Sequence, residues 1–276
     1  MNYIHDDFML RGEAAKRLYH EHVEGLPIID YHGHLSPEQI ADDTRFENLT
    51  RIWLDGDHYK WRIMRACGVR ERLITGGVGD WKRFEAWAET MPKLLRNPLY
   101  HWSHMELATI FGIRDRQLDA YSAQHVWGAC NERLSGDGFS ARDLIRRHGV
   151  RVVATTDDPA DSLEHHERFA AEGEAPGFRM VPTLRPDRGM DLSDHDAFTD
   201  WITRLQLQTG MEIDRFETLL MALDKRYDAF AALGCRASDH AVEVPHAVPF
   251  TGAQVEEAFS RARTGKPVSE EQVRMY

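Results

Sequence analysis

The 276-residue sequence has few cysteines, no long apolar run and no excess of basic residues. Its three cysteines, Cys67, Cys130 and Cys235, are widely spaced and form no Cys-x-x-Cys pair, so a disulfide framework is not expected. No apolar stretch approaches the roughly 20 residues that a membrane-spanning helix needs. Basic residues number 34 against 45 acidic ones, and the net charge of −11 argues against general binding to nucleic acid or anionic membranes. The first residues show no signal peptide, so we expect a cytoplasmic protein.

Four apolar segments are predicted to be buried strands that end in polar residues. They are residues 28–34, 150–156, 178–184 and 234–238. Because each follows a helical stretch and ends in charge, the pattern predicts β–α units with functional groups at one edge. Pro182 lies inside the third segment, where it is typical of a bulge or a strand end, since proline cannot donate to a ladder.

The first and second segments are separated by about 115 residues, far more than one crossover helix needs. This stretch is predicted to be mostly helical, at residues 37–41, 48–53, 58–66, 80–90, 99–111, 123–134 and 140–147. A further long helix is predicted at 214–233, and Ser269 is predicted to cap another. We therefore divide the chain into an N-terminal segment with the first strand (1–36), an inserted helical subdomain (37–149), and the later strands with their helices (150–276).

A closed α/β barrel needs eight strands, and only four are expected by residue 240. Four more β–α units would need on the order of 120 residues, far more than follow. The sequence thus predicts either a smaller open sheet or the front part of a longer barrel protein. In the second case, an isolated 1–276 polypeptide is expected to be poorly soluble and inactive, because its sheet would keep an open edge.

The tripeptide His32-Gly33-His34 ends the first predicted strand. Side chains alternate along a strand, so both imidazoles should point to the same side. Two imidazoles at the carboxyl end of a strand can hold a divalent metal, at the end where α/β barrels keep their chemistry. Two histidines are not a complete site, so a pair of solvated histidines remains the alternative.

Six ordered blocks of the sequence resemble the uronate (glucuronate) isomerase family, a divergent branch of the amidohydrolase superfamily. They are DYHGHL (30–35), WLDGDHYKWR (53–62), NPLYHW (97–102), TTDDP (155–159), LRPD (184–187) and SDHA (238–241). The resemblance runs along the whole chain. It implies an α/β fold, a distorted (β/α)8 barrel of amidohydrolase type with a large helical insertion after its first strand. This chain would hold about four strands of it, without the family's remaining metal-binding aspartate and a second substrate-binding arginine.

The activity that the resemblance implies is an aldose–ketose exchange in hexuronate catabolism. D-glucuronate would be converted to D-fructuronate, and D-galacturonate to D-tagaturonate. A base removes the C2 proton, an enediol forms, and a proton is delivered to C1. The small-molecule hexuronate is the expected partner; nucleic acid and membranes are not expected, and a homo-oligomer is left open.

The resemblance also implies roles for particular residues. His32 and His34 would bind one divalent metal, zinc or alternatively manganese, with no organic cofactor. Tyr59 would donate to the carbonyl oxygen or shuttle a proton, and His58 would bind a sugar hydroxyl. The alternative for this pair is aromatic packing on an amphipathic helix.

Two more residues are candidates at the predicted strand ends. Arg185 precedes a proline that keeps it out of a helix, and its guanidinium suits a carboxylate or adjacent hydroxyls. A salt bridge with Asp187 or Asp158 is the alternative. His240 is assigned to the rim of the pocket. The pair Asp157-Asp158 before Pro159 is interpreted as an ordinary turn.

Two other functions remain open from the sequence. His-x-His on a first strand is shared by metal-dependent amidohydrolases, which usually add a lysine on the fourth strand. Residues 235–240 contain no lysine, which disfavours a bridged two-metal site. The second alternative is a fragment that catalyses nothing.

Overall fold

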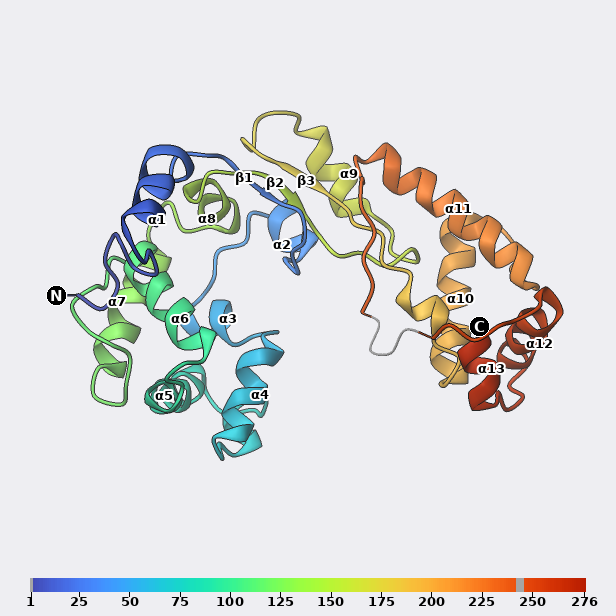
Figure 1. Cartoon of the computed structure of the whole chain (residues 1–276), viewed down its shortest axis with the longest axis horizontal. Helices are drawn as coiled ribbons and strands as arrows, with labels where there is room; N and C mark the ends of the chain where they lie inside the picture. Colours follow the sequence, from blue (N-terminus) through green and yellow to red (C-terminus); the bar gives the residue numbers. More distant parts are fainter. Residues whose placement is uncertain (1, 242–245) are drawn as a thin grey trace. The chain divides into compact units, whose positions relative to one another are not determined.

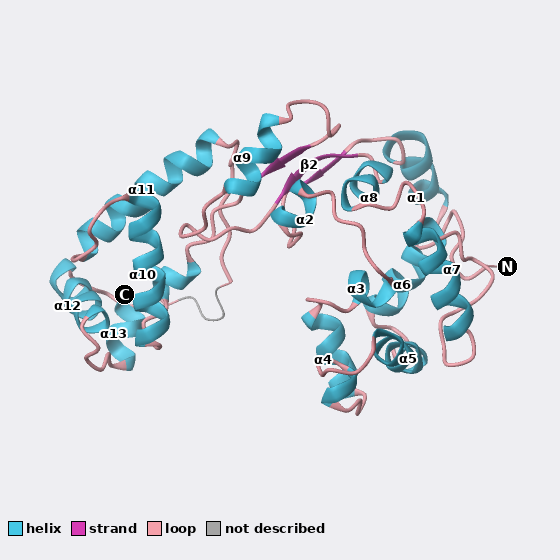
Figure 2. Cartoon of the chain, turned by 180° about the vertical axis from the view of Figure 1, so that it is seen from behind, coloured by secondary structure: helices cyan, strands magenta, loops and turns pink. Residues whose placement is uncertain are grey.

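The computed structural model of this chain describes residues 2–241 and 246–276. The chain forms two compact units, each described here by itself. Unit 1 comprises Met1–Pro27 and Asp43–Gly149, and unit 2 comprises Ile28–Asp42 and Val150–Tyr276. Figure 2 shows the strands gathered in one small sheet, with helices and loops making up the rest of the described chain.

Unit 1 is helical. Its helices are α1 (Glu13–Leu18), a π-helical turn (Tyr19–Val23), α3 (Leu49–Trp53), α4 (His58–Ala66), α5 (Asp80–Thr90), α6 (Pro98–Thr109), α7 (Ala123–Ser135) and α8 (Ala141–Arg147), with 3₁₀ turns at Glu71–Leu73 and Met91–Lys93. Side-chain caps define several starts: Asn48 accepts from the Arg51 amide, and Asp57 accepts from the amides of Tyr59 and Lys60. Ser140 begins α8 with a reciprocal capping box to Asp143.

The core of unit 1 is closed around large side chains from α4, α5 and α6. Phe84, Trp87, Met64 and Leu107 are all fully buried. Such burial contributes roughly 1.5–3 kcal/mol per large apolar side chain, which is what holds these short helices together. Helices α3, α5 and α7 contact one another around this core.

Unit 2 contains a three-stranded parallel sheet in the order β1–β2–β3, formed by Ile28–Asp30, Val150–Ala154 and Arg179–Val181 (Figure 1). Its helices are α2 (Pro37–Ala41), α9 (Glu164–Ala171), α10 (His195–Thr209), α11 (Phe216–Ala232), α12 (Gly252–Arg263) and α13 (Glu270–Met275), with a 3₁₀ turn at Asp187–Met190.

The two faces of the sheet differ. Val153 and Met180 are paired in register and buried on the face where α9 contacts β3. The alternate positions, among them Ile29, Val152 and Val181, line a cavity of about 300 Å³. A separate apolar cluster, with Trp201 and Phe259 at its centre, joins α10, α11 and α12.

The fourth predicted strand is wrong as a strand. Residues 234–238 form a single parallel bridge, Ser238 to Leu184, and no ladder. Among the described residues this segment pairs with one neighbour, so little backbone bonding holds it extended. Pro182 marks the end of β3 at Val181, as its missing N–H predicts.

The α/β class is confirmed, and so are most predicted helices. Those at 37–41, 58–66 and 80–90 match at both ends, and Ser269 caps α13 as predicted. The long helix predicted at 214–233 spans Phe216–Ala232. Within the described part of the chain, no helix combines the length and apolar character needed to cross a membrane.

Candidate functional site

Four segments of unit 2 bring their carboxyl ends to one edge of the sheet. The Gly33 amide donates to the Ala154 carbonyl over 2.9 Å, and the Thr183 amide donates to Thr155 over 3.0 Å. The Asp239 amide donates to the Leu184 carbonyl over 3.3 Å, which places the fourth segment beside the third even without a regular strand. Parallel alignment therefore collects side chains that are far apart in the sequence.

At this edge, five side chains form a chain of charged contacts that we call the rim network: His32, Asp239, Arg185, Asp187 and His240. His32 Nδ1 lies 2.9 Å from Asp239 Oδ2, and Arg185 Nη2 lies 3.2 Å from the same oxygen. Arg185 Nε lies 3.4 Å from Asp187 Oδ2, and His240 Nδ1 lies 3.1 Å from Asp187 Oδ1. The structure thus brings together three of the predicted site residues, His32, Arg185 and His240.

His34, the fourth predicted residue of this edge, meets His32 edge to face, with ring centroids 5.0 Å apart. Between them, Gly33 lies close to β2. A Cβ on Gly33 would approach Asp30 Oδ2 to 3.3 Å and the Ala154 carbonyl to 3.5 Å, so a larger residue would need a small shift of the Asp30 side chain.

The ion pair of Arg185 with Asp187 is the salt bridge considered from the sequence, and Asp158 is paired elsewhere, with Arg188 at 3.7 Å. Arg185 Nε and Asp239 Oδ1 are buried atoms without a hydrogen-bond partner among the described residues. Buried polar atoms usually have hydrogen-bond partners. These two atoms are therefore able to bind a further polar group at this edge.

Asp157 sits behind this edge in a buried polar cluster. Thr155 Oγ1 donates to Asp157 Oδ2 over 2.7 Å and lies 2.8 Å from His166 Nε2. Burial raises the pKa of Asp157 to about 6 and lowers the pKa of His166 to about 4. Asp158 accepts from the Ala160 amide and from Trp201 Nε1, as the predicted turn requires. Both carboxylates thus accept hydrogen bonds from neighbouring donors of unit 2, and their interpretation as structural residues stays a prediction.

His58 and Tyr59 lie in unit 1, at the start of α4. Asp57 caps this helix, and the two rings stack with centroids 4.5 Å apart. Tyr59 is 62% exposed, and with Arg62 and Trp102 it lines a cavity of about 500 Å³. The exposure of Tyr59 does not favour the core-packing alternative, because a packing residue would be covered by its neighbours.

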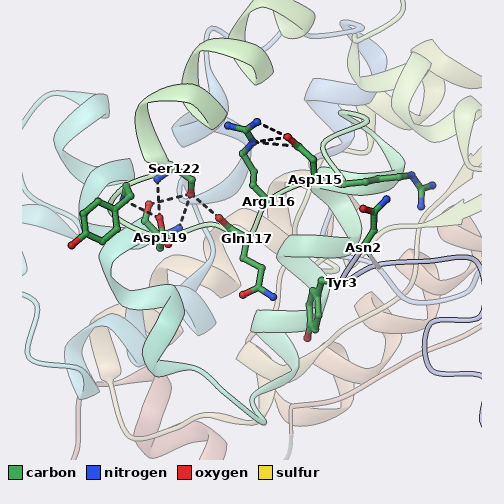
Figure 3. A pocket seen from close by; sticks show the side chains of 9 residues that line it. Asn2, Tyr3, Asp115, Arg116, Gln117, Asp119 and Ser122 are labelled. Carbon is green, nitrogen blue, oxygen red and sulfur yellow. Dashed lines mark hydrogen bonds and ion pairs between the residues drawn. The ribbon is translucent and has the colours of Figure 1, made fainter.

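A second cavity of unit 1, of about 510 Å³, is polar (Figure 3). Tyr3, Arg116 and Ser122 are among its lining residues. Arg116 is paired with Asp115, and Ser122 bonds with Asp119, so these groups have partners within the wall itself. Among the described residues, no metal-ligating cluster lines this cavity.

The family resemblance implies a divalent metal at this edge. Among residues 2–241 and 246–276, no group of three His, Cys, Asp or Glu is arranged to hold a metal. The two imidazoles provide part of a ligand set, and catalytic zinc normally takes three protein ligands. The His32–Asp239 contact is the kind of outer contact that metal-binding histidines make. The described residues of this edge therefore supply two imidazoles and no third ligand placed with them.

Comparison with known proteins identifies the family. A family model described as glucuronate isomerase matches residues 1–276. The chain belongs to the glucuronate isomerase family. It is 47% identical over 268 residues to a uronate isomerase of Cellvibrio japonicus, and 45% identical over 273 residues to one of Bacteroides thetaiotaomicron. These alignments cover 96% and 99% of this chain, but 56% and 58% of the relatives.

Solved structures of the glucuronate isomerase family have the same fold. The uronate isomerase of Thermotoga maritima matches with a TM-score of 0.90 at 30% identity, over 99% of this chain and 59% of that one. The glucuronate isomerase of Caulobacter crescentus matches with a TM-score of 0.88 at 25% identity, over 99% and 58%. The chain thus spans a little more than half the length of the relatives it matches.

Sequence reasoning missed Asp239, whose carboxylate contacts both His32 and Arg185. Asp187 was considered only as a salt-bridge partner of Arg185, yet its carboxylate also contacts His240. Both aspartates follow predicted strand ends, and that position was a partial signal.

Proposed function

We propose that this protein is an aldose–ketose isomerase of hexuronates. It would interconvert D-glucuronate with D-fructuronate, and D-galacturonate with D-tagaturonate, by moving a proton between C2 and C1 through an enediol. The observation that carries this proposal is the match of residues 1–276 to the glucuronate isomerase family. The edge of unit 2, where an arginine and two imidazoles gather, is consistent with it.

Arg185 is proposed to grip the substrate carboxylate or its adjacent hydroxyls. A guanidinium offers paired N–H donors in a fixed plane, which suits the two oxygens of a uronic acid. In the structure two carboxylates, Asp187 and Asp239, hold this guanidinium from two sides. The side chain is therefore oriented before any substrate arrives, which lowers the entropic cost of binding.

His32 and His34 are proposed to hold a divalent metal, zinc or alternatively manganese. When bound, such an ion supplies Lewis-acid polarisation of a substrate oxygen. The protein's own part is to present the two imidazoles at one edge, where their ring centroids lie 5.0 Å apart.

Tyr59 is proposed to donate its hydroxyl hydrogen to the substrate carbonyl oxygen or to pass a proton between oxygens, and His58 to bind a hydroxyl. Their exposure and stacking at the start of α4 support a role in contacting a small molecule. His240, paired with Asp187, is proposed to line the rim.

We further propose that the three parallel strands belong to a distorted (β/α)8 barrel. The order of strands and helices in unit 2 and the fold match to the Thermotoga maritima isomerase support this proposal. The cytoplasmic location and the hexuronate substrate stay predictions from the sequence. Whether the protein forms a homo-oligomer stays open.

The proposal is tested by following ketose formation from hexuronates, with esters, amides and lactones as alternative substrates. Residues 1–276 alone, which are expected to be inactive, are compared with a polypeptide of the relatives' full length. Arg185→Lys keeps the charge but loses the forked geometry, so kcat/KM should fall by about tenfold or more, equivalent to about 1.4 kcal/mol. Arg188→Lys is a matched control, because Arg188 contacts Asp158 and lies outside the rim network. Hydrolysis of an ester or lactone without ketose formation would overturn the proposed reaction.

A further inference from the structure

Lys60 directly follows His58 and Tyr59 on α4, and its side chain is buried. Consecutive residues on a helix point about 100° apart, so Lys60 faces the core of unit 1 while Tyr59 stays exposed. Lys60 is only 7% exposed, although proteins almost never bury a lysine that has no partner. A lysine in this place therefore needs a partner for its charge.

The partner is Asp57, the residue that caps α4. Asp57 Oδ1 accepts hydrogen bonds from the amides of Tyr59 and Lys60 over 3.1 and 3.0 Å. Asp57 Oδ2 accepts a hydrogen bond from Lys60 Nζ over 2.7 Å. A hydrogen bond between two charged groups at this distance is among the stronger ones in proteins. Both oxygens of one carboxylate thus hold the first turn of α4.

Two indole rings lie beside the ammonium group. Lys60 Nζ is 5.9 Å from the ring centroid of Trp53 on α3 and 6.0 Å from that of Trp87 on α5, and both tryptophans are buried. An ammonium within about 6 Å of an aromatic face is attracted to it. Burial raises the pKa of Glu106 on α6, and the charge of Lys60 opposes that rise, so a second carboxyl group lies nearby. Lys60 therefore connects the start of α4 with α3 and α5.

Stability alone does not account for a lysine in this position. An apolar side chain of similar length would fill the same space, and replacing a buried ion pair by apolar residues is often neutral or stabilising. The ammonium differs from such a side chain because its hydrogen bond to Asp57 has a direction. The turn that this bond holds carries the rings of His58 and Tyr59, which stack with centroids 4.5 Å apart.

We propose that Lys60 is a positioning residue for His58 and Tyr59: through its hydrogen bond to Asp57, and beside two indole rings, it fixes the orientation in which the start of α4 presents the two rings to the substrate. This inference rests on the proposed function of that pair. Lys60 acts through its neighbours and is not assigned a contact with the substrate.

The first test follows the two rings and needs no activity. A polypeptide of the relatives' full length, labelled at histidine, is compared with its Lys60→Met variant by NMR, and the signal lost in His58→Gln assigns the His58 ring. In the wild type the face of Tyr59 shifts the His58 signals, because the rings are stacked. In the folded Lys60→Met variant these signals should move toward those of an unstacked histidine.

Lys82→Met is the matched control for the loss of an ammonium group. Lys82 Nζ bonds to Glu85 over the same 2.7 Å and at the same spacing of three residues, but its side chain is 60% exposed on α5. This variant should leave the His58 signals and the isomerase activity unchanged.

The second test measures isomerase kinetics on the same polypeptides. Lys60→Met should lower kcat/KM for D-glucuronate by about 10–100-fold, chiefly through kcat, because a misplaced group stabilises the transition state less well. Asp57→Asn breaks the same bond but keeps a capping oxygen, and should show a similar loss. The double variant should lose little more than either single one, since both remove one interaction. Lys60→Arg should recover part of the activity, because a guanidinium also donates to Asp57 and stacks on aromatic faces.

Thermal unfolding of each variant separates positioning from loss of structure. In a folded Lys60→Met protein, wild-type His58 signals would overturn the proposal, and so would wild-type kcat/KM. If Lys60→Met does not fold, the same two results in Asp57→Asn decide, and loss of the fold in both variants would overturn the proposal, because the bond would then serve stability. A wild type that converts no hexuronate would contradict the proposed function, and the His58 signals alone would then decide the role of Lys60.

Discussion

Unit 1 and unit 2 bury their apolar side chains in different ways. In unit 1 the helices enclose a common core, and residues such as Phe84 and Trp87 are wholly buried. In unit 2 the sheet has one face packed with α9, while on β1 the side chain of Ile29 is 64% exposed. A helix hides its apolar stripe by contacting other helices nearby in the chain, whereas a sheet has two faces and needs a layer on each.

The charged rim network and the closed apolar core lie in different units, although the proposed site residues His58 and Tyr59 belong to unit 1. The rim network lies wholly in unit 2, at the carboxyl ends of parallel segments. Six of the seven tryptophans, all except Trp201, fall in unit 1. Tryptophan fluorescence therefore reports chiefly on unit 1, which makes the two units separable in unfolding experiments.

The largest effect is expected from opening the closed core. Phe84→Ala should lower the free energy of unfolding by about 3–5 kcal/mol, because it removes a fully buried ring and leaves a cavity. Urea unfolding followed by tryptophan fluorescence measures this loss.

Ile29→Ala is the matched change on the open sheet face, and should stay within about 0.5 kcal/mol of wild type. Circular dichroism is the better readout for this control, because unit 2 holds little tryptophan. Equal losses for the two substitutions would mean that the open face of the sheet is as well packed as the helical core.

A second effect comes from the buried pair behind the rim. With a pKa of about 6, folded Asp157 holds its proton over a range in which the unfolded chain has lost it, so its contribution to stability falls as pH rises from about 4 to 6. Folded His166, with a pKa of about 4, stays neutral where the unfolded chain is protonated, so its contribution rises with pH from about 4 to 6.5. In the wild type the two trends oppose each other.

Asp157→Asn removes the contribution of the carboxyl group and leaves the pH dependence that comes from His166. The free energy of unfolding of this variant should therefore rise by about 2–3 kcal/mol between pH 4 and 6.5. His166→Asn should show the opposite sign over the same range. Urea unfolding at a series of pH values measures both. A flat profile in both variants would show that neither group titrates with a shifted pKa.

The smallest effect is expected at the helix caps. Ser140→Ala should cost about 1 kcal/mol, because buried Ser140 accepts from the Asp143 amide in unit 1. Ser269→Ala removes a similar capping box from the exposed start of α13 in unit 2 and should cost less. A larger loss at Ser269 would indicate that α13 contributes more to unit 2 than its exposed start suggests.

Most helices were predictable because their signals are local. Asp57 and Ser140 cap their helices through hydrogen bonds to amides two or three residues on. β3 ends before Pro182 because proline has no backbone N–H to donate to a neighbouring strand. The fourth segment failed as a strand because extended structure depends on neighbouring segments, which a single stretch of sequence does not reveal.

The sequence by itself determined the family and the helical character of unit 1. It also placed His32 and His34 near the end of the first strand, but that strand ends at Asp30, so both histidines follow it and are not part of it. These depend on motifs and on periodicities of a few residues. Only the tertiary structure decided that Asp239 would meet both His32 and Arg185, and that Asp187 would join Arg185 to His240. The reason is physical: parallel alignment of distant segments sets these distances, and the register that aligns them is fixed by backbone hydrogen bonds and packing across the whole sheet.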